Sequence, residues 1–463
     1  MTNQVDVLVL GGGPGGYVAA IRAAQRGLSV AVVETKWWGG VCLNVGCIPT
    51  KTLLRNAEIA GVVRQPEFGI DGDFSVDYGV AWRRSREVAD RMAKGVSFLL
   101  KKNRITALDG WGCFTSPHTM TVRQAGDASD WTFEHAIIAT GASPKSLPGV
   151  RIGGRVMTYE QFIMSEQMPQ SLIIAGSGAI GVEFATVAAA FGSDVTIVEY
   201  VDRLVPGEDP AISRELARAF RKRGISFLTG TAVQGVDEDD DGVTVHVNPV
   251  SGGEGRQLRA DALLLALGFA PSTSGFGLET TGVTLDDAGF VATDDAMRTA
   301  VPHIFAVGDV TGKLMLAHVA QRQGVIAAET IAGSSPLPLD YTSVPRATYC
   351  EPSIGSVGLT AVQAEADGHV VKTSRFPFSA NGKAQALGET AGFVLLVADA
   401  TSDELLGAHL IGPGVTEMLP ELVLAKTWGL TADQIAVTVH AHPSLSEAIM
   451  EAAEGVNGSA IDL

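Results

Sequence analysis

Cysteine is scarce in this sequence, with four residues among 463. So few thiols in a long chain exclude a disulfide-stapled extracellular scaffold and favour a reducing compartment. Basic residues are outnumbered by acidic ones, and the net charge of −17 disfavours a nucleic-acid partner. No apolar run approaches the roughly 20 residues that a membrane helix needs, and the first residues lack the basic patch of a secretory signal. We therefore expect a cytoplasmic protein.

Two of the four cysteines stand close together, in residues 39–51 with the sequence GGVCLNVGCIPTK. Residues five apart on a regular helix point roughly 140° away from each other, so a Cys42–Cys47 bridge requires a distorted segment. Gly46 supplies flexibility there, and Pro49 supplies helix-starting geometry. Exposed disulfides in short loops are the kind that cycle between oxidised and reduced forms. The stretch therefore predicts a redox-active disulfide.

A glycine-rich turn precedes that stretch and lies between two expected strands. The aliphatic run 5–10 leads into GGGPGG at 11–16, then a helix is expected over 17–26 and a strand over 28–33. Gly11 permits the tight turn, Gly13 lets the backbone approach a pyrophosphate, and Gly16 lets helix and strand pack closely. The helix N-terminus offers unpaired N–H groups to phosphates. Glu34 then follows, placed to accept hydrogen bonds from an adenosine ribose.

The same pattern occurs a second time. A strand over 171–175 leads into GSGAIG at 176–181, followed by a helix to 191, a strand over 195–198 and Glu199. Two copies predict two nucleotides between which electrons pass. Glu199 favours a free ribose 2′-hydroxyl over a 2′-phosphate, which indicates NAD rather than NADP. Arg203, four residues further on, is predicted to be a surface residue.

Three other segments carry charge patterns of interest. Residues 77–102 have the apolar spacing of a helix, and their basic side chains are expected on its solvated face: Arg83, Arg84, Arg86, Lys94, Lys101 and Lys102. The acidic run 237–242 is predicted to be a hairpin tip and not a metal site. Asp309 ends the apolar run that begins at 304, and a carboxylate at that end of a parallel strand lies where ligands bind, although a helix cap is the alternative.

The C-terminal third ends in a histidine-rich motif, HAHPSLSE at residues 440–447. His440 is predicted to be structural. His442 is followed five residues later by Glu447, which offers a base and a carboxylate to orient it, as proton transfer to or from a thiol requires. Spacing alone leaves a structural role for His442 open as well.

Together these motifs resemble the FAD-dependent pyridine nucleotide-disulfide oxidoreductases, and among them the dihydrolipoamide dehydrogenases. The resemblance covers essentially the whole chain. It implies an α/β fold with two Rossmann-like dinucleotide-binding domains, for FAD and NAD, and a C-terminal α+β dimerisation domain. The implied boundaries are 1–149 for the FAD-binding domain, 150–275 for the NAD-binding domain, 276–343 for a central segment that completes the FAD site, and 344–463 for the dimerisation domain.

The resemblance also implies the residues of each site. For FAD they are Gly11, Gly13, Pro14, Gly16, Glu34, Gly40, Val41, Cys42, Lys51, Gly112, Thr140, Gly141, Asp309, Leu316, Ala317 and His318. For NAD they are Gly176, Gly178, Ala179, Ile180, Gly181, Glu199 and Gly268. The implied catalytic residues are Cys42, which exchanges with substrate, Cys47 nearest the flavin, Lys51 paired with Glu183, and His442 oriented by Glu447. His442 would serve the disulfide of the other subunit of a homodimer.

The implied activity is oxidation of protein-bound dihydrolipoamide with reduction of NAD, and the implied partners are lipoyl domains of 2-oxo acid dehydrogenase complexes or the glycine cleavage carrier protein. Two positions depart from the common pattern: Gln323 stands where many members have Glu, and Ser444 where many have Thr. Four alternatives fit the sequence less well. Glutathione reductase-like proteins typically use NADPH, and Glu199 disfavours binding of its 2′-phosphate. Mercuric reductases are expected to carry a cysteine pair near the C-terminus, and residues 455–463 contain none. Related transhydrogenases typically lack one cysteine of the redox pair, whereas this sequence has both. A flavoprotein that only binds would not need Cys42, Cys47, His442 and Glu447 together.

Overall fold

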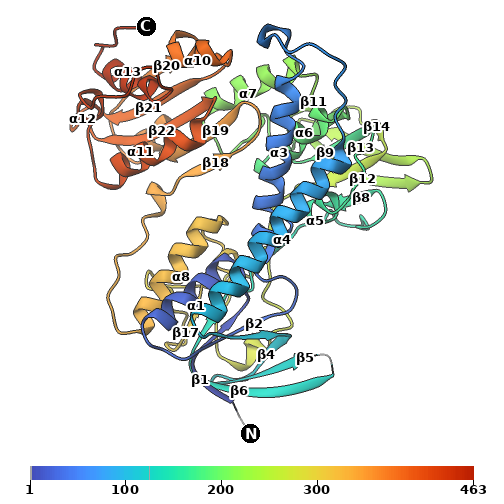
Figure 1. The fold of residues 1–463 in the computed structure, drawn as a ribbon, viewed down its shortest axis with the longest axis vertical. Helices are drawn as coiled ribbons and strands as arrows, with labels where there is room; N and C mark the ends of the chain where they lie inside the picture. The colour runs from blue at the N-terminus through green and yellow to red at the C-terminus, as the bar shows by residue number, and fades with distance from the viewer. Residues whose placement is uncertain (1–2, 125, 463) are drawn as a thin grey trace. The chain divides into compact units, whose positions relative to one another are not determined.

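The computed structural model describes residues 3–124 and 126–462, which form two compact units, each assembled from three segments. The first unit comprises Met1–Thr52, Gly79–Lys145 and Gly268–Leu339. The second comprises Leu53–Tyr78, Ser146–Leu267 and Asp340–Leu463. Figure 1 labels their helices and strands.

The first unit is built on a seven-stranded sheet, ordered β3-β2-β1-β6-β5-β4 with β17 also paired to β6. Its parallel strands are β1 (Asn3–Leu10), β2 (Val30–Glu34), β3 (Thr106–Asp109), β6 (Asp127–Ile138) and β17 (Ile304–Ala306). The antiparallel ones are β4 (Trp111–Ser116) and β5 (Thr119–Gln124). A separate ribbon pairs β7 (Ala142–Pro144) with β16 (Phe269–Pro271). Apolar side chains cover both faces of β1, as expected of a central parallel strand.

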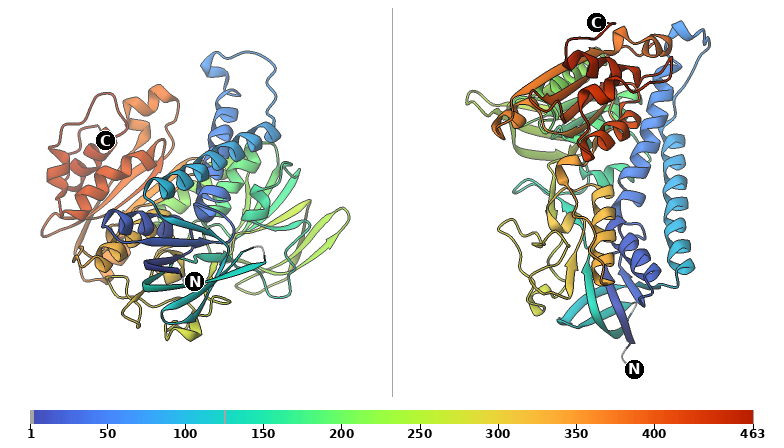
Figure 2. Two further views of the ribbon diagram at one scale, coloured as in Figure 1. Left: turned by 60° about the horizontal axis from the view of Figure 1, so that its bottom comes forward. Right: turned by 90° about the vertical axis from the view of Figure 1, so that its left-hand side faces the viewer.

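Two helices pack side by side against this sheet, α1 (Pro14–Gln25) and α8 (Ala317–Ile331) (Figure 2). Glycine makes their close approach possible, because a Cβ on Gly324 would lie 2.5 Å from the carbonyl oxygen of Gly15. The remaining helices of this part are α2 (Gly40–Asn44), α3 (Cys47–Val62), which continues into the second unit, α4 (Tyr78–Lys102), and the short 3-10 helices η2 (Leu278–Thr280) and η3 (Asp309–Thr311).

The second unit contains a five-stranded parallel sheet, ordered β11-β10-β9-β15-β8. Its strands are β8 (Val156–Thr158), β9 (Ser171–Ala175), β10 (Asp194–Val198), β11 (Ser226–Leu228) and β15 (Ala262–Leu265). Its helices are α5 (Tyr159–Ile163), α6 (Ala179–Ala190) and α7 (Pro210–Lys222); η1 (Pro66–Phe68) belongs to the same unit. An antiparallel sheet adds β12 (Thr231–Asp239), β13 (Gly242–Pro249) and β14 (Arg256–Ala260). The β12–β13 hairpin confirms the one predicted around the acidic run.

An antiparallel sheet, ordered β18-β19-β22-β21-β20, forms the C-terminal part of the second unit. Its strands are β18 (Arg346–Thr348), β19 (Ser353–Gly358), β20 (Val371–Pro377), β21 (Phe393–Asp399) and β22 (Leu405–Gly412). The helices are α9 (Ala361–Ala366), α10 (Gly382–Leu387), α11 (Val415–Thr427), α12 (Ala432–Ala436) and α13 (Glu447–Val456), with η4 (Tyr341–Ser343) and η5 (Phe378–Ala380). Apolar residues of α11 and α13 share one core with one face of the sheet.

The α/β fold class predicted from the sequence is confirmed. The apolar run 262–271, whose sequence predicts one strand, is divided in the structure, because β15 ends at Leu265 and a separate strand, β16, begins at Phe269. Gly268 lies between them with a φ of +86°, which breaks the strand. Among the described residues, we find no helix with the length and apolar character needed to cross a bilayer.

Candidate active site

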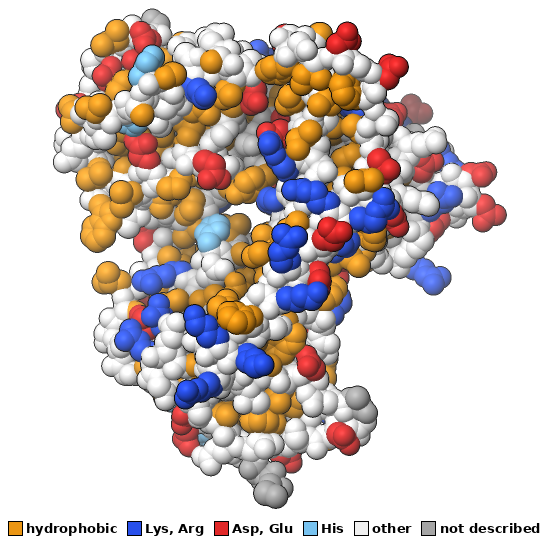
Figure 3. Space-filling view, viewed as in Figure 1, with side chains coloured by type: hydrophobic (Ala, Val, Ile, Leu, Met, Phe, Trp, Pro, Cys, Tyr) orange, Lys and Arg blue, Asp and Glu red, His pale blue; other side chains and the backbone are white. Residues whose placement is uncertain are grey.

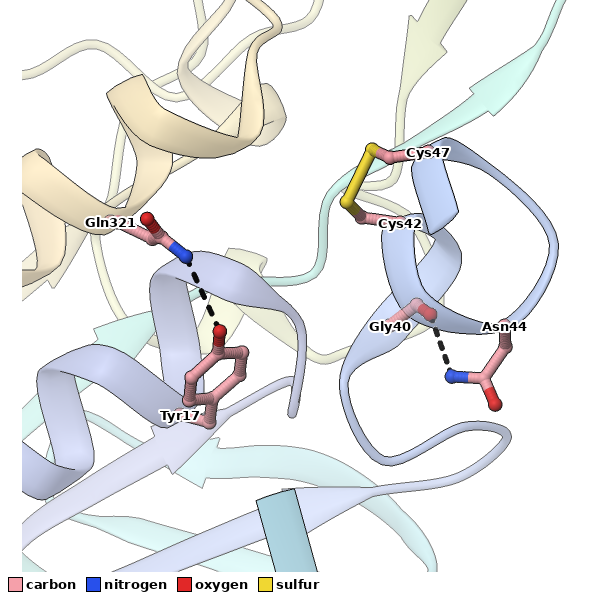
Figure 4. Close-up of a disulfide and its surroundings, with 6 residues drawn as sticks. All are labelled: Tyr17, Gly40, Cys42, Asn44, Cys47 and Gln321. Carbon is pink, nitrogen blue, oxygen red and sulfur yellow. Dashed lines mark hydrogen bonds between the residues drawn. A yellow bond between two sulfur atoms is a disulfide. The ribbon is translucent and has the colours of Figure 1, made fainter. Parts of the chain in front are cut away.

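The two cysteines of the 39–51 stretch are joined by a disulfide (Figure 4). Helix α2 ends at Asn44 and α3 begins at Cys47, so the predicted distortion is a break between two helices. The break brings the Cα atoms of Cys42 and Cys47 to 4.6 Å from each other. Because Cys47 is the first residue of α3, the helix N-terminus would stabilise its thiolate. Lys51 stands four residues later, on the same face of the helix.

This redox segment packs directly on the first glycine-rich turn. The N–H of Gly39 donates to the carbonyl of Gly12 at 2.9 Å. Gly40 has a φ of +65°, and a Cβ there would lie 2.6 Å from the Cα of Gly13. Asn44 closes the loop from the other side, with Nδ2 donating to the carbonyl of Gly40 at 2.9 Å (Figure 4). The segment that carries the two cysteines is therefore in direct contact with the first turn.

The acidic residue after each fingerprint has the same local geometry. Glu34 accepts a hydrogen bond from the backbone N–H of Gly12 at 2.8 Å. Glu199 accepts from the backbone N–H and from Oγ of Ser177, both at 2.7 Å. Each carboxylate thus lies beside the glycine-rich turn of its own unit, at the carboxyl end of a parallel strand, where a ribose is bound in such folds.

Both glycine-rich turns leave open space at the helix N-terminus, where the phosphates of a dinucleotide would bind. Helices α1 and α6 begin after Gly13 and Gly178, and neither of these N-caps receives a side-chain hydrogen bond. A Cβ on Gly13 would meet the nearest described atom only at 3.8 Å, and one on Gly178 would meet none within 4 Å. By contrast, a Cβ on Gly16 or Gly181 would lie within 2.0 Å of a carbonyl oxygen of its own turn. The backbone is open where a pyrophosphate approaches and closed where the helix must pack.

The other residues assigned to the NAD site do not all lie in the same unit. Ala179 and Ile180 open α6, and Gly176, with a φ of +102°, turns the chain past the carbonyl of Ala266. Arg203 is tied to the carbonyl of Pro206 at 3.0 Å and to Asp202. The remaining assigned residue, the interrupting glycine at position 268, falls in the first unit.

Further residues assigned to FAD surround the first turn. A Cβ on Gly11 would lie 2.2 Å from the carbonyl of Ala139, and the Oγ1 of the next residue, Thr140, donates to Ser272 at 2.6 Å. Gly141 has a φ of +74°. Gly112 lies in β4, where its missing side chain makes room for Leu10, Val33 and Met120. That packing accounts for the glycine, and its contact with FAD stays a prediction.

Asp309 follows β17, whose strand lies in the same sheet as β1. Burial raises the pKa of Asp309 to about 6, so the folded chain keeps a carboxyl group there that is costly to ionise without hydrogen-bond donors. The preceding N–H, that of Gly308, donates to Oε1 of the fully buried Gln323 at 2.6 Å. Gln323 therefore supplies the acceptor without adding a second carboxylate. Leu316, Ala317 and His318 lie at the start of α8, the helix that carries Gln323.

The sequence did not predict one residue that supports the redox segment. Arg86 was expected on the solvated face of α4, yet it is half-buried and its guanidinium donates to the carbonyl of Asn44 at 2.7 Å. The expectation was wrong because residue 86 faces the redox segment, whereas the other five residues named for the solvated face are exposed. Figure 3 shows Lys and Arg side chains along the band of surface that α4 occupies in Figure 1.

The histidine of the C-terminal motif has the predicted carboxylate partner. His442 is highly exposed, and its Nδ1 lies 2.8 Å from Oε1 of Glu447. Oε2 of Glu447 accepts from the N–H of Ser444 at 2.7 Å. Burial alone would raise the pKa of Glu447, but the hydrogen bonds from Ser444 and His442 and the charges of His442 and His440 lower it overall. The carboxylate is thus held ionised beside an exposed imidazole, which fixes the ring orientation of a base.

The structure therefore gathers the assigned residues in two sets. All those assigned to FAD, together with Cys47, belong to the first unit. Glu183, His442, Glu447 and the second fingerprint belong to the second unit, where Glu183 accepts from the N–H of Tyr349 at 2.9 Å. The pairing of Lys51 with Glu183 and the approach of His442 to a disulfide join residues of different units, and both stay predictions.

A disulfide between two short-spaced cysteines beside a dinucleotide turn, with a second such turn in the same chain, defines a class of redox enzymes. The chain belongs to the pyridine nucleotide-disulphide oxidoreductase family, whose model matches residues 5–324, and the family's dimerisation domain matches residues 344–453. FAD and NAD are the cofactors of this family.

Among curated proteins, the chain is similar to the dihydrolipoyl dehydrogenases. It is 51% identical to that of Mycobacterium tuberculosis, covering 99% of this chain and 100% of the other, and 42% identical to that of Bacillus subtilis, covering 100% of both. Among solved structures, it is similar to LpdA from Mycobacterium tuberculosis, with a TM-score of 0.90, 27% identity and 98% and 100% coverage. It is also similar to the flavoprotein disulfide reductase RclA from Escherichia coli, with a TM-score of 0.89, 28% identity and 98% and 100% coverage.

Proposed function

We propose that this chain is a dihydrolipoyl dehydrogenase that oxidises protein-bound dihydrolipoamide and reduces NAD. The observation that carries the proposal is the Cys42–Cys47 disulfide, seated on the first dinucleotide turn through Gly39 and Gly40. Full-length similarity to dihydrolipoyl dehydrogenases supports the substrate. When bound, FAD supplies an acceptor for the electron pair of the reduced cysteines, and NAD supplies the final hydride acceptor.

The protein's own residues carry out the exchange of thiol and disulfide. His442 takes the proton of one substrate thiol, and the resulting thiolate attacks Sγ of Cys42. The Cys42–Cys47 bond breaks, and Cys47 leaves as a thiolate at the N-terminus of α3. The second substrate thiol then closes the lipoyl disulfide while its proton passes to the departing sulfur of Cys42. The substrate loses two electrons and two protons, and the cysteine pair gains the two electrons.

The other assigned residues hold the cofactors and the charges. In our proposal the first fingerprint, with Glu34 and Asp309, holds FAD, and the second fingerprint with Glu199 and Gly268 holds NAD. Lys51, paired with Glu183, stabilises the negative charge that develops near Cys47. The sequence-derived domain boundaries at 149, 275 and 343 are part of the same proposal.

The dimerisation domain supports a homodimer in which His442 of one subunit serves the cysteines of the other. That arrangement would place the exposed imidazole of His442 against a partner's disulfide. The partners that we propose are lipoyl domains of 2-oxo acid dehydrogenase complexes or of the glycine cleavage carrier protein, met in the cytoplasm.

The test uses the FAD-loaded protein and three cysteine variants. Cys47→Ser and Cys42→Ser should each abolish NAD reduction by dihydrolipoamide, while NADH oxidation by a dye that accepts electrons directly from flavin continues. Cys113→Ser is the matched control, since Cys113 is a half-buried free thiol of the same unit. Parent-level lipoamide turnover in Cys47→Ser would overturn the mechanism. Activity with NADPH and glutathione disulfide, in place of activity with NAD and dihydrolipoamide, would overturn the proposed choice of substrates.

A further inference from the structure

The C-terminal half of α4 has one face that the core of the protein does not use. Val96 and Leu100 turn inward, with 4% and 1% of their surface exposed, and pack in the core of the first unit. The exposed side chains of this half recur at the spacing of adjacent helical turns. We call them the α4 stripe, which consists of Arg91, Met92, Gly95, Phe98, Leu99 and Lys102.

The α4 stripe leaves large apolar side chains in water. Phe98 is 65% exposed, Met92 43% and Leu99 38%. Single exposed hydrophobic residues are ordinary on a protein surface, whereas an apolar patch bordered by polar groups is typical of an interaction site. Figure 3 shows hydrophobic and basic side chains interspersed along the band of surface that α4 occupies in Figure 1. The stripe therefore has the composition of a docking face.

The charge of this region is opposite in sign to that of the chain. Residues 91–102 include four basic residues and no acidic one, whereas the whole chain has a net charge of −17. Within that range, Lys94 alone forms an ion pair with a described residue, at 2.6 Å from Asp90. Arg91, Lys101 and Lys102 are therefore available to the carboxylates of another molecule. A basic face on an acidic protein selects an acidic partner and orients its approach.

Gly95 interrupts the stripe without a reason inside the protein. It lies in the interior of the 25-residue α4, where glycine is among the least favourable residues. A Cβ at this position would meet no described atom within 4 Å, so packing within the chain does not require a glycine. A missing side chain lets the backbone of another molecule approach the helix closely. Gly95 thus marks the point on the stripe where a partner can come nearest to α4.

Two observations decide which partner fits the stripe. The family's dimerisation domain matches residues 344–453, a range that excludes α4, so the stripe lies outside the segment assigned to contact between two copies. The same helix braces the redox segment through Arg86 and Asn44, and the stripe and the disulfide belong to the same unit. A substrate thiol pair that is carried on a protein requires a face for that protein on the unit that holds the disulfide.

We infer that the α4 stripe docks the acidic surface of a lipoyl-bearing carrier domain. Arg91 and Lys102 pair with its carboxylates, Phe98 packs on its apolar surface, and Gly95 admits its backbone. Charged contacts at the rim of such a face act chiefly on the rate of association and on its salt dependence, which suits a carrier that must leave after each turnover. The inference rests on the proposed function and names the surface that recognises its protein-bound substrate.

The experiment uses FAD-loaded full-length enzyme and two substrates, free dihydrolipoamide and a purified, reduced lipoylated carrier domain of net negative charge. The measured quantity is the ratio of kcat/KM with the carrier domain to kcat/KM with free dihydrolipoamide. In the double variant Arg91→Glu and Lys102→Glu, this ratio should fall at least about tenfold at low salt. The difference from the parent should shrink at about 0.5 M salt, because the charges are screened. The control is Arg123→Glu with Lys145→Glu, two exposed residues of the same unit, which should keep the parent ratio.

Gly95→Gln tests the inference without removing any contact in the chain. Glutamine favours the helix more than glycine does, so the unfolding midpoint should rise while the ratio falls several-fold. Gly61→Gln is its control, because a Cβ on Gly61 in α3 also meets no described atom within 4 Å, and its ratio should equal that of the parent.

Parent ratios in both the double variant and Gly95→Gln would overturn the inference. A lower mass of the double variant in sedimentation would overturn it as well, because the stripe would then be a contact between copies of this chain. The proposed function has a separate outcome. A parent that oxidises neither substrate refutes that function, whereas a parent that oxidises both, with variants that keep its ratio, refutes only the docking site.

Discussion

The buried carboxyl group of Asp309 makes a quantitative prediction about the FAD-free protein. Burial raises the pKa of Asp309 from 3.8 to about 6. One pKa unit corresponds to about 1.4 kcal/mol, so ionising Asp309 in the folded protein costs at most about 3 kcal/mol more than in the unfolded chain. Asp309→Asn removes the ionisation and keeps nearly the same shape.

The sign follows from which state holds the proton more tightly. The folded state keeps the proton of Asp309 to higher pH than the unfolded state does. The parent therefore loses stability as pH rises from about 4 to about 6 and loses no more above that range. Asp309→Asn lacks this loss, so the FAD-free variant should be the more stable protein at neutral pH. FAD hydroxyls that donate to the carboxylate would offset the cost, and the advantage should shrink or reverse in the FAD-loaded enzyme.

The assay is thermal unfolding of FAD-depleted protein at about pH 4 and about pH 8. For a unit of this size, 3 kcal/mol corresponds to roughly 6–12 °C in the midpoint, and the gap between variant and parent should widen by up to that amount at the higher pH. Asp287→Asn is the control, since Asp287 is exposed on a turn of the same unit. A gap that is the same at both pH values would refute the reasoning.

Three further predictions concern contacts around the turns and the redox segment. Gly178→Ala should leave FAD content and the unfolding midpoint unchanged, because its methyl group meets no described atom within 4 Å, but it should raise KM for NAD at least about tenfold. Gly13→Ala should instead weaken FAD retention. An unchanged KM for NAD in Gly178→Ala would contradict the proposed NAD site. Arg86→Met should lower lipoamide turnover roughly tenfold without lowering dye-linked NADH oxidation, because the carbonyl of Asn44 loses its brace; equal loss of both activities would contradict it. Gln323→Leu leaves the buried N–H of Gly308 unpaired and should cost about 1–3 kcal/mol of stability. Gln323→Glu is the control, because it keeps the acceptor. Equal unfolding midpoints for Gln323→Leu and the parent would contradict the role of Gln323 as that acceptor.

Much of the fold could be predicted because its signals are local. The strand expected over 171–175 is β9 with the same bounds, and both glycine turns lead into helices. Strand, turn and helix in these units are specified by residues within about thirty positions. The disulfide belongs to the same class of signal, since glycine and proline near the cysteines predict the break between α2 and α3.

The contacts that could not be predicted join residues far apart in the chain. Arg86 reaches Asn44 across 42 positions, and His440 reaches Glu421 across 19. When only its own helix or loop is considered, Arg86 has the spacing of a solvated residue, and His440 is indistinguishable from a structural histidine. Only the packing of a second element shows that Arg86 braces the redox segment and that His440 is held by a carboxylate of α11.

The first glycine turn and the redox segment are best understood as one structure. Gly40 must be glycine both because its φ is +65° and because Gly13 occupies the space of a side chain. The same contact places α2 against the N-terminus of α1, where a pyrophosphate would bind. A side chain at Gly40 would therefore push the redox segment away from the dinucleotide turn. In the proposed function, this contact would set how closely Cys47 can approach a flavin bound at the first turn, which makes the spacing of the cysteines from that turn part of the proposed electron path.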